Sequence, residues 1–217
     1  MSGPLIIAID GPAAAGKGTL ARRMAAELGL PYLDTGLLYR AVGRRVLDRA
    51  GDPRDATVAT AEALALSPAD LERQDLRTPE AALAASGVAA IPGVRAALLE
   101  FQRNFGRSRG AVLDGRDIGT VVFPDASVKF FITASPEARA QRRWLEMTAA
   151  GQAIPLAQVE AETRQRDKQD AERATAPMRP AEDALVLDTT ALDANAAFVA
   201  VMAQLRSRLG ALGVTIA

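Results

Sequence analysis

The sequence contains no cysteine and no histidine, and these two absences exclude several kinds of chemistry. Without cysteine, the chain can form neither disulfide bonds nor thiolate metal sites. Without histidine, it lacks the side chain that most often acts as a general base near neutral pH, and also the commonest zinc ligand. Any catalysis must therefore use carboxylates, lysine, arginine, hydroxyl groups, backbone amides or a bound ion.

The sequence also lacks an excess of charge of either sign and lacks any long apolar run. The 26 Lys and Arg residues are balanced by 26 Asp and Glu residues, which gives no support to duplex-DNA binding. No apolar segment approaches the ~20 residues that a membrane span requires. The first four residues, Met1–Pro4, include no basic residue of the kind that opens a signal peptide. We therefore expect a cytoplasmic protein that binds neither nucleic acid nor membranes.

The remaining composition, 217 residues of which 49% are hydrophobic, is that of an ordinary globular chain. Short apolar segments are expected to be buried strands: 5–9, 111–113, 128–132 and 184–187. Segments with helical spacing lie between and after them: 19–28, 37–49, 92–105 and 193–212. In the third of these, Val94, Leu98, Phe101 and Phe105 share the expected buried side. The alternation predicts an α/β fold with a parallel, doubly wound sheet of about five strands flanked by helices.

A glycine-rich turn, Gly11–Thr19, follows the first expected strand and opens the first expected helix. In that context it predicts a phosphate-binding loop, because glycines let successive amides turn inward and the helix N-terminus adds about half a positive charge. Lys17 would meet the β- and γ-phosphates of ATP. Gly18 stands where Ser or Thr is usual, so Thr19 is the expected hydroxyl near Mg²⁺. The alternative is a turn without a ligand. The expected ATP contacts here are Gly11, Pro12, Ala13, Ala14, Ala15, Gly16, Lys17, Gly18 and Thr19.

This form of the loop resembles that of the adenylate-kinase-like nucleoside-monophosphate kinases, a family of P-loop proteins, and three further segments narrow the resemblance. Asp34–Arg40, Asp114–Pro124 and Arg166–Pro177 resemble, in this order, the motifs of bacterial-type cytidylate kinases. No Asn-Lys-x-Asp motif occurs, which argues against a GTPase. The resemblance covers residues 6 to about 189 and implies ATP-dependent phosphorylation of CMP and dCMP to CDP and dCDP in pyrimidine nucleotide metabolism, with Mg²⁺ as cofactor.

The resemblance also implies an acceptor site for CMP. Its residues are Arg40, Arg116 and Arg173 for the α-phosphate; Ser86, Arg95 and Asp117 for cytosine; Arg166 and Asp170 for the ribose; and Thr35 and Tyr39 from the first motif. The chemistry agrees, because an arginine fork binds two phosphate oxygens at once and a carboxylate can accept a hydrogen bond from the amine of cytosine.

These acceptor residues have simpler alternatives. Arg166, Asp170 and Arg173 stand at helical spacing and could form surface ion pairs of little energetic worth. Ser86 could merely break a helix. Tyr39 is expected to pack against its neighbours rather than to stack on a base.

On the donor side, the resemblance adds a metal-water position and a lid. Asp114 would end a strand and hold Mg²⁺ through water, or it could cap the following turn. Lid arginines would close over ATP, and they are Arg139, Arg142 and Arg143. The alternative is a solvated helix face, on which they pair with Glu137 and Glu146. The catalytic roles would fall to Lys17, Asp114, Arg116 and Arg173.

We expect a single P-loop kinase domain over residues 1–217, with an insert and a lid. Its core would comprise 1–39, 109–135 and 177–217, the acceptor-binding insert about 40–108, and the lid about 136–176. Many members of the resembled family carry a hairpin sheet in the insert. Here the insert has few β-branched residues and no Asn-Gly turn, so we expect helix and loop.

Two other functions remain open at this point. One is a kinase for another acceptor, such as AMP, UMP or shikimate. The other is a nucleotide-binding module that transfers no phosphoryl group. The sequence shows no separate dimerisation element, and we expect a monomer.

Overall fold

The computed structural model describes residues 3–213, and the chain divides into two compact units. The first unit comprises residues 1–33 and 106–217, and the second comprises residues 34–105. The second unit is therefore one continuous segment of the chain, inserted between the two segments that form the first.

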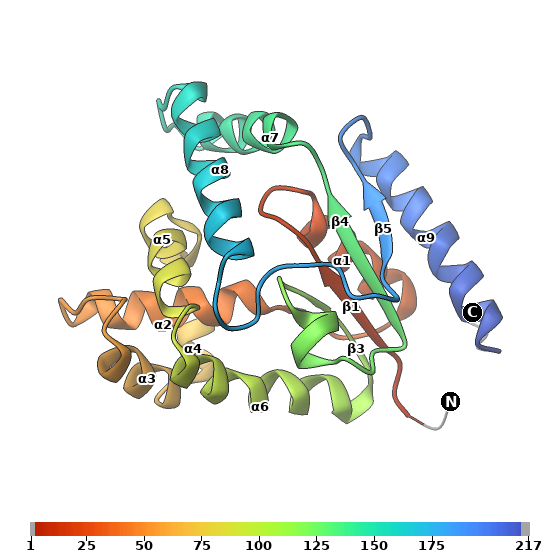
Figure 1. Cartoon of the computed structure of the whole chain (residues 1–217), viewed down its shortest axis with the longest axis horizontal. Helices are drawn as coiled ribbons and strands as arrows, with labels where there is room; N and C mark the ends of the chain where they lie inside the picture. The colour runs from red at the N-terminus through yellow and green to blue at the C-terminus, as the bar shows by residue number, and fades with distance from the viewer. Residues whose placement is uncertain (1–2, 214–217) are drawn as a thin grey trace. The chain divides into compact units, whose positions relative to one another are not determined.

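The first unit is built on a five-stranded sheet with the strand order β2-β3-β1-β4-β5 (Figure 1). In chain order the strands are β1 (Ile6–Asp10), β2 (Tyr32–Asp34), β3 (Ala111–Asp114), β4 (Val128–Thr133) and β5 (Leu185–Asp188). The β1 strand pairs in parallel with β3 on one side and with β4 on the other, and β4 pairs in parallel with β5. Both β1 and β3 are buried along their whole length, as expected for central strands of a parallel sheet. The predicted α/β fold is confirmed.

The two faces of β1 have different neighbours in this unit. The helices α1 (Lys17–Leu28) and α9 (Ala194–Ala211) pack on the face that carries Ile7 and Ile9. Because side chains alternate along a strand, Asp10 points to the opposite face. There the π-helical turn η2 (Ile118–Val122) donates hydrogen bonds to it. The unit also contains α7 (Pro136–Ala149) and α8 (Leu156–Ala171).

Local sequence signals fix the ends of these helices. Gly29 closes α1 in the left-handed region, with φ 62°. Ser135 begins α7, where its hydroxyl accepts a hydrogen bond from the backbone N–H of Ala138 at 3.2 Å and Pro136 takes the first helical position. The Asp193 carboxylate caps α9 by accepting hydrogen bonds from two successive backbone N–H groups, both at 2.8 Å.

The second unit consists of helices and loops. It contains α2 (Thr35–Asp48), α3 (Ala56–Leu64), α4 (Pro68–Leu71), the 3-10 turn η1 (Gln74–Arg77), α5 (Pro79–Val88) and most of α6 (Pro92–Arg109). No strand occurs within residues 35–105, all of which the structure describes, so the expected absence of a hairpin is confirmed. The helix α2 approaches α5 closely at Gly43, where a Cβ atom would lie 2.8 Å from the Cβ atom of Ala84.

One expectation for α6 was wrong. Phe101 is 43% exposed, whereas Gln102 beside it is 2% exposed. Val94 and Leu98 are buried as expected, so the inner face follows a spacing of four residues, which carries it to Gln102. Over residues 3–213, no single helix is long and apolar enough to span a membrane, and the bent pair α5 and α6 meets that criterion by length and composition only.

Candidate functional site

The loop between β1 and α1 has the backbone of an anion-binding turn. Gly11 has φ 137°, and a Cβ atom there would lie 2.0 Å from the carbonyl oxygen of Ile132, so only glycine fits. Ala14 and Gly16 are left-handed, with φ 58° and 90°, and such residues turn successive N–H groups toward a common side. No side chain caps the N-terminus of α1. The first amides of this helix are therefore suited to an anionic ligand.

Polar side chains hold the carbonyl groups of the same loop. The Lys17 ammonium donates a hydrogen bond to the carbonyl oxygen of Pro12 at 2.7 Å. The Thr189 hydroxyl, which follows β5, donates to the carbonyl oxygen of Ala15 at 3.1 Å. The loop is thus held by its own lysine and by a hydroxyl group from a distant part of the chain.

Positive charge gathers around Lys17. Burial lowers the pKa of this lysine well below its usual value, and the nearby Arg116 guanidinium lowers it further. The carboxylates of Asp114 and Asp10 oppose this effect, whereas Arg166 adds to it. Three cationic side chains therefore interact in one buried region of the first unit. A polyphosphate bound there would relieve their mutual repulsion.

Asp114 ends β3 and faces the first turn of α1. It is 8% exposed, and its Oδ1 atom accepts a hydrogen bond from the Tyr32 hydroxyl at 2.8 Å. Its Oδ2 atom lies 3.7 Å from the position that a Cβ atom would take on Gly18. Thr19, the next residue, is exposed. Carboxylate and hydroxyl oxygens are the donors that Mg²⁺ prefers, so these residues fit that ion.

No group of three or more potential metal-ligating side chains occurs within residues 3–213. Mg²⁺ needs no such group, because it retains several waters and takes substrate phosphate oxygens as ligands.

Asp170 joins two of the predicted phosphate-binding arginines. Its carboxylate, 1% exposed, accepts a hydrogen bond from Nε of Arg116 at 2.9 Å and another from Arg173. The alternative of surface ion pairs is therefore wrong for Asp170. The structure brings the second and third motifs together at this carboxylate.

The three predicted lid arginines have different surroundings. Arg139 is 2% exposed and makes two hydrogen bonds to the carboxylate of Asp167 on α8, one of them at 2.9 Å. Arg142 donates to the hydroxyl of Thr189 at 3.0 Å. Arg143 is partly exposed and approaches a glutamate of its own helix at 3.7 Å. The alternative of a solvated helix face is wrong for Arg139 and agrees with the surroundings of Arg143.

The other predicted acceptor residues lie on helices of the second unit. Thr35 is the buried first residue of α2. The guanidinium of Arg95 lies 5.8 Å from the ring centroid of Tyr39, and Arg40 donates to a carbonyl of η1 at 3.3 Å. Ser86 lies within α5, where its hydroxyl donates to the carbonyl oxygen one turn earlier at 3.3 Å, so the idea that it breaks a helix is wrong.

A family model described as cytidylate kinase matches residues 7–207. The chain belongs to the cytidylate kinase family. The cytidylate kinase of Acidiphilium cryptum is 62% identical over 200 residues, which cover 92% of this chain and 94% of that protein. The cytidylate kinase of Granulibacter bethesdensis is 63% identical over 194 residues, which cover 89% of this chain and 93% of that protein.

A solved structure shares the fold of this cytidylate kinase family member. It is an uncharacterized protein from Eubacterium ventriosum, with a TM-score of 0.55 and 13% identity. The match covers 94% of this chain and 99% of that one. At this identity the likeness concerns the fold alone.

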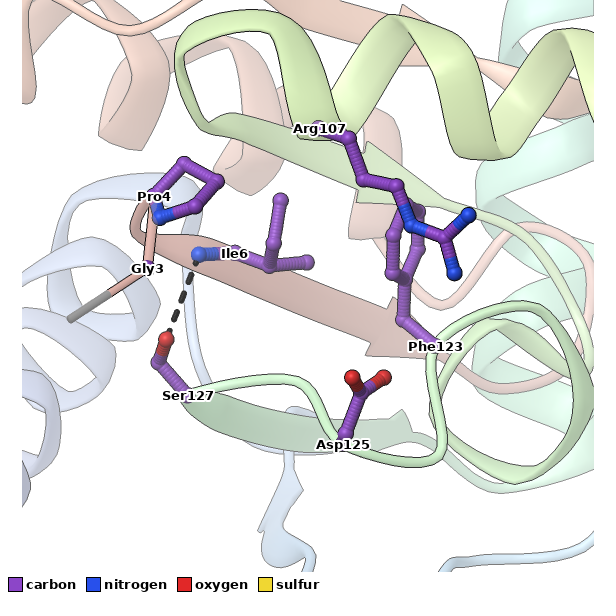
Figure 2. Close-up of a pocket in the computed structure, with 7 residues that line it drawn as sticks. All are labelled: Gly3, Pro4, Ile6, Arg107, Phe123, Asp125 and Ser127. Atoms are coloured by element: carbon purple, nitrogen blue, oxygen red, sulfur yellow. Dashed lines mark hydrogen bonds between the residues drawn. The ribbon is translucent and has the colours of Figure 1, made fainter. Parts of the chain in front are cut away.

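A hollow of about 320 Å³ lies elsewhere in the first unit (Figure 2). It is lined by Gly3, Pro4, Ile6, Arg107, Phe123, Asp125 and Ser127. Ile6 begins β1, and its N–H donates to the hydroxyl of Ser127 at 3.3 Å. The phosphate loop follows the opposite, carboxyl end of β1, where parallel α/β sheets bind their ligands. The hollow is therefore separate from the candidate kinase site.

Four residues around this site were not predicted from the sequence. Asp10 carried a readable signal, because a carboxylate at the end of an apolar strand and directly before the phosphate loop needs a partner. Asp167 stood beside Arg166 in the third motif but had no assigned role. Tyr32 and Thr189 belong to no motif, and only the fold brings them to Asp114 and to the phosphate loop.

Proposed function

We propose that this chain transfers the γ-phosphoryl group of ATP to CMP and dCMP, which yields ADP with CDP or dCDP, in pyrimidine nucleotide metabolism. Membership of the cytidylate kinase family supports this function. The observation that carries it is the gathering of Lys17, Arg116 and Arg166 beside Asp114, at the carboxyl ends of β1 and β3.

The donor phosphates would bind the loop of residues 11–19. Its amides and the N-terminus of α1 favour negative charge, and Lys17 would leave the carbonyl oxygen of Pro12 for a γ-phosphate oxygen. The bound anion would raise the lowered pKa of Lys17, so that the ammonium stays charged. Phosphoryl transfer needs little covalent help from protein, and this alignment of charge supplies most of what it requires.

Asp114, through water, and the hydroxyl of Thr19 are the residues that would hold Mg²⁺. Bound there with the phosphate oxygens, the ion neutralises charge on the β- and γ-oxygens. Tyr32 contributes by fixing the orientation of the Asp114 carboxylate through its hydrogen bond.

The acceptor phosphate would be bound by Arg116 and Arg173. In the ligand-free protein the carboxylate of Asp170 holds both guanidinium groups, which keeps them close together. CMP would draw them onto its α-phosphate and leave Asp170 to the ribose, beside Arg166. The carboxylate of Asp117 would accept a hydrogen bond from the amine of cytosine.

The second unit would supply the remaining acceptor contacts, from Thr35, Tyr39, Arg40, Ser86 and Arg95. The helices α7 and α8 would form a lid that excludes water until both substrates are bound. Its arginines, above all Arg143 with its partial exposure, would then be available to ATP.

An acceptor panel tests the proposed function. Transfer from ATP to CMP, dCMP, UMP, AMP, GMP and shikimate is measured by separating the products. CMP and dCMP should be the best acceptors, and ATP should be consumed only when an acceptor is present. A preference for AMP, UMP or shikimate, or turnover of ATP without an acceptor, would contradict the proposal.

Single variants test the assigned roles. Lys17→Ala should abolish transfer in a folded protein. Arg116→Ala and Arg173→Ala should each raise the KM for CMP and lower kcat, because a fork that binds the phosphate also aligns it. Arg107→Ala removes an arginine from the separate hollow and should leave all kinetic constants unchanged. If these variants changed only the KM for ATP, Arg116 and Arg173 would instead be assigned to the binding of ATP.

We further propose that the enzyme acts as a cytoplasmic monomer, with an acceptor-binding insert of about 40–108 and a lid of about 136–176. Its substrates are soluble nucleotides, and the sequence carries no separate dimerisation element. Light scattering at the assay concentration tests the monomer, and a mass of two chains would contradict it.

A further inference from the structure

The carboxylate of Asp10 is buried and bound at both oxygens by one short turn. It is 4% exposed and ends β1. Its Oδ1 atom accepts a hydrogen bond from the backbone N–H of Ile118 at 2.7 Å, and its Oδ2 atom accepts one from that of Gly119 at 2.7 Å. These are the first two residues of η2. A carboxylate loses much hydration free energy when it is buried. A contact that served only to stabilise the fold would not need to carry this desolvation cost.

The segment bound by Asp10 is also held from a second strand. A Cβ atom on Gly119 would lie 3.4 Å from Oδ2 of Asp10 and 3.1 Å from the Cδ atom of Lys129. Lys129, 8% exposed on β4, donates a hydrogen bond to the carbonyl oxygen of Pro124 at 2.6 Å. Residues 118–124 are therefore held at their beginning by Asp10 of β1 and at their end by Lys129 of β4.

Two hydrogen bonds join the loop between β3 and η2 to the end of β1, one before Arg116 and one after Asp117. The N–H of Gly115 donates to the carbonyl oxygen of Ile9 at 2.9 Å. The N–H of Ile118 donates to Asp10, the next residue of β1. Between these two attachments lie only Arg116 and Asp117. Their backbone is thus anchored at each end to the strand that leads directly into the phosphate loop.

We propose that Asp10 is a positioning residue, which holds Arg116 and Asp117 in register with the phosphate loop and thereby sets both acceptor alignment and base discrimination. The inference rests on the proposed function, which gives Arg116 the acceptor phosphate and Asp117 the cytosine amine. Asp117 is 5% exposed and is the residue from which η2 begins, so a shift of the η2 backbone moves its side chain. Asp10 acts through these residues and does not itself touch a substrate.

Asp193 provides a matched comparison. Its carboxylate also accepts hydrogen bonds from two successive backbone N–H groups, both at 2.8 Å, but it does so at the exposed start of α9 and not at the loop that carries Arg116 and Asp117. A cap of this kind stabilises a helix. If Asp10 did no more than this, its replacement would change stability alone.

The test compares Asp10→Asn with Asp193→Asn. An amide at position 10 keeps the shape of the side chain, offers one acceptor oxygen and turns an NH₂ group toward the second backbone N–H. We measure kcat and KM for CMP and UMP at saturating ATP, and the affinity for a non-hydrolysable ATP analogue by calorimetry. In Asp10→Asn, kcat/KM for CMP should fall by about tenfold or more, as for a lost hydrogen bond to a charged group.

The ratio of kcat/KM for CMP to that for UMP is the deciding readout. It should fall in Asp10→Asn, while the affinity for the ATP analogue changes less than kcat/KM for CMP does. It should stay at the wild-type value in Asp193→Asn. An unchanged ratio in Asp10→Asn, whatever happens to the rates, would reduce Asp10 to a structural residue and overturn the proposal.

A second pair of variants covers a failure of Asp10→Asn to fold. Gly119→Ala presses a methyl group against the Asp10 and Lys129 side chains, whereas Gly210→Ala on α9 meets nothing within 4 Å. The ratio of kcat/KM for CMP to that for UMP should fall in Gly119→Ala and stay at the wild-type value in Gly210→Ala. The same ratio in both variants would overturn the proposal. If the wild type prefers another nucleoside monophosphate, the proposed function fails. The positioning role is then decided by whether these variants change the preference for that acceptor.

Discussion

Protonation of Asp10 should make the stability of the fold depend on pH in an unusual direction. Burial raises the pKa of this carboxyl from 3.8 to about 6, and the charge of Asp117 adds to the rise, although the N–H groups of Gly119 and Ile118 and the charge of Lys17 lower it. The pKa in the folded state thus lies above that in the unfolded state. The stabilising contribution is complete below about pH 3.8 and is lost as the pH rises through 6.

The magnitude follows from the two pKa values. A difference between 3.8 and about 6 corresponds to about 3 kcal/mol of unfolding free energy, all of it lost by neutral pH. This loss is the free energy that the fold gives up to keep an ionised Asp10 beside η2 under working conditions.

Urea denaturation of the wild type and of Asp10→Asn between pH 4 and 7.5 measures this effect. The variant cannot titrate at position 10, so subtraction of the two curves removes the contributions that other groups make equally to both. The unfolding free energy of the wild type relative to the variant should fall by about 2.5 kcal/mol across this range, since part of the full effect lies below pH 4. A flat difference, or one that rises with pH, would refute the reasoning.

Asp193→Asn serves as a control of opposite sign. The N–H groups of Ala196 and Asn195 lower the pKa of Asp193 in the folded protein. The contribution of this carboxylate is therefore present above its unfolded pKa and is lost as the pH falls. The corresponding difference curve should rise with pH.

Three further predictions concern other parts of the chain. Arg45→Met should reduce the unfolding free energy, measured with urea, by on the order of 3 kcal/mol, because within residues 3–213 it leaves the 5% exposed Glu62 side chain with the exposed Arg49 as its remaining ion-pair partner. Gly11→Ala should abolish binding of an ATP analogue in calorimetry, because its Cβ atom would overlap a backbone oxygen of β4; wild-type affinity would contradict the loop geometry. Hydrogen exchange in residues 136–171 should slow when a bisubstrate analogue binds, and equal exchange with and without it would count against a closing lid.

Much of the fold could be predicted because its signals are local. The apolar strands, the glycine of the phosphate loop and the cap at Ser135 each depend on a few neighbouring residues, so they could be read in sequence. The helical insert was predictable for the same reason, since it lacks the alternation that a hairpin requires. Asp10 could also have been found, because its position in an apolar strand is itself a local signal.

The rest of the candidate site depends on contacts between distant segments. Helical spacing at Arg139, Arg142 and Arg143 is compatible with a solvated face and with a buried one. Only the fold reveals that Arg139 meets Asp167 on another helix. The prediction that Phe101 is buried was wrong for a related reason. Several overlapping sets of apolar residues could form the buried face of a helix of that length, and tertiary packing selects one of them.

The insertion of the second unit between β2 and β3 has a consequence for the speed of folding. These strands are neighbours in the sheet, and the N–H of Val112 donates a hydrogen bond to the carbonyl oxygen of Pro31 at 2.9 Å. The whole segment 34–105 lies between these two residues in the chain, so this pairing is strongly non-local, and such pairings slow folding. The inserted unit consists of helices whose hydrogen bonds are local, and it can become compact first and bring the two strand ends together. Refolding should therefore show an early helical phase, followed by a slower phase in which β3 takes its place between β2 and β1.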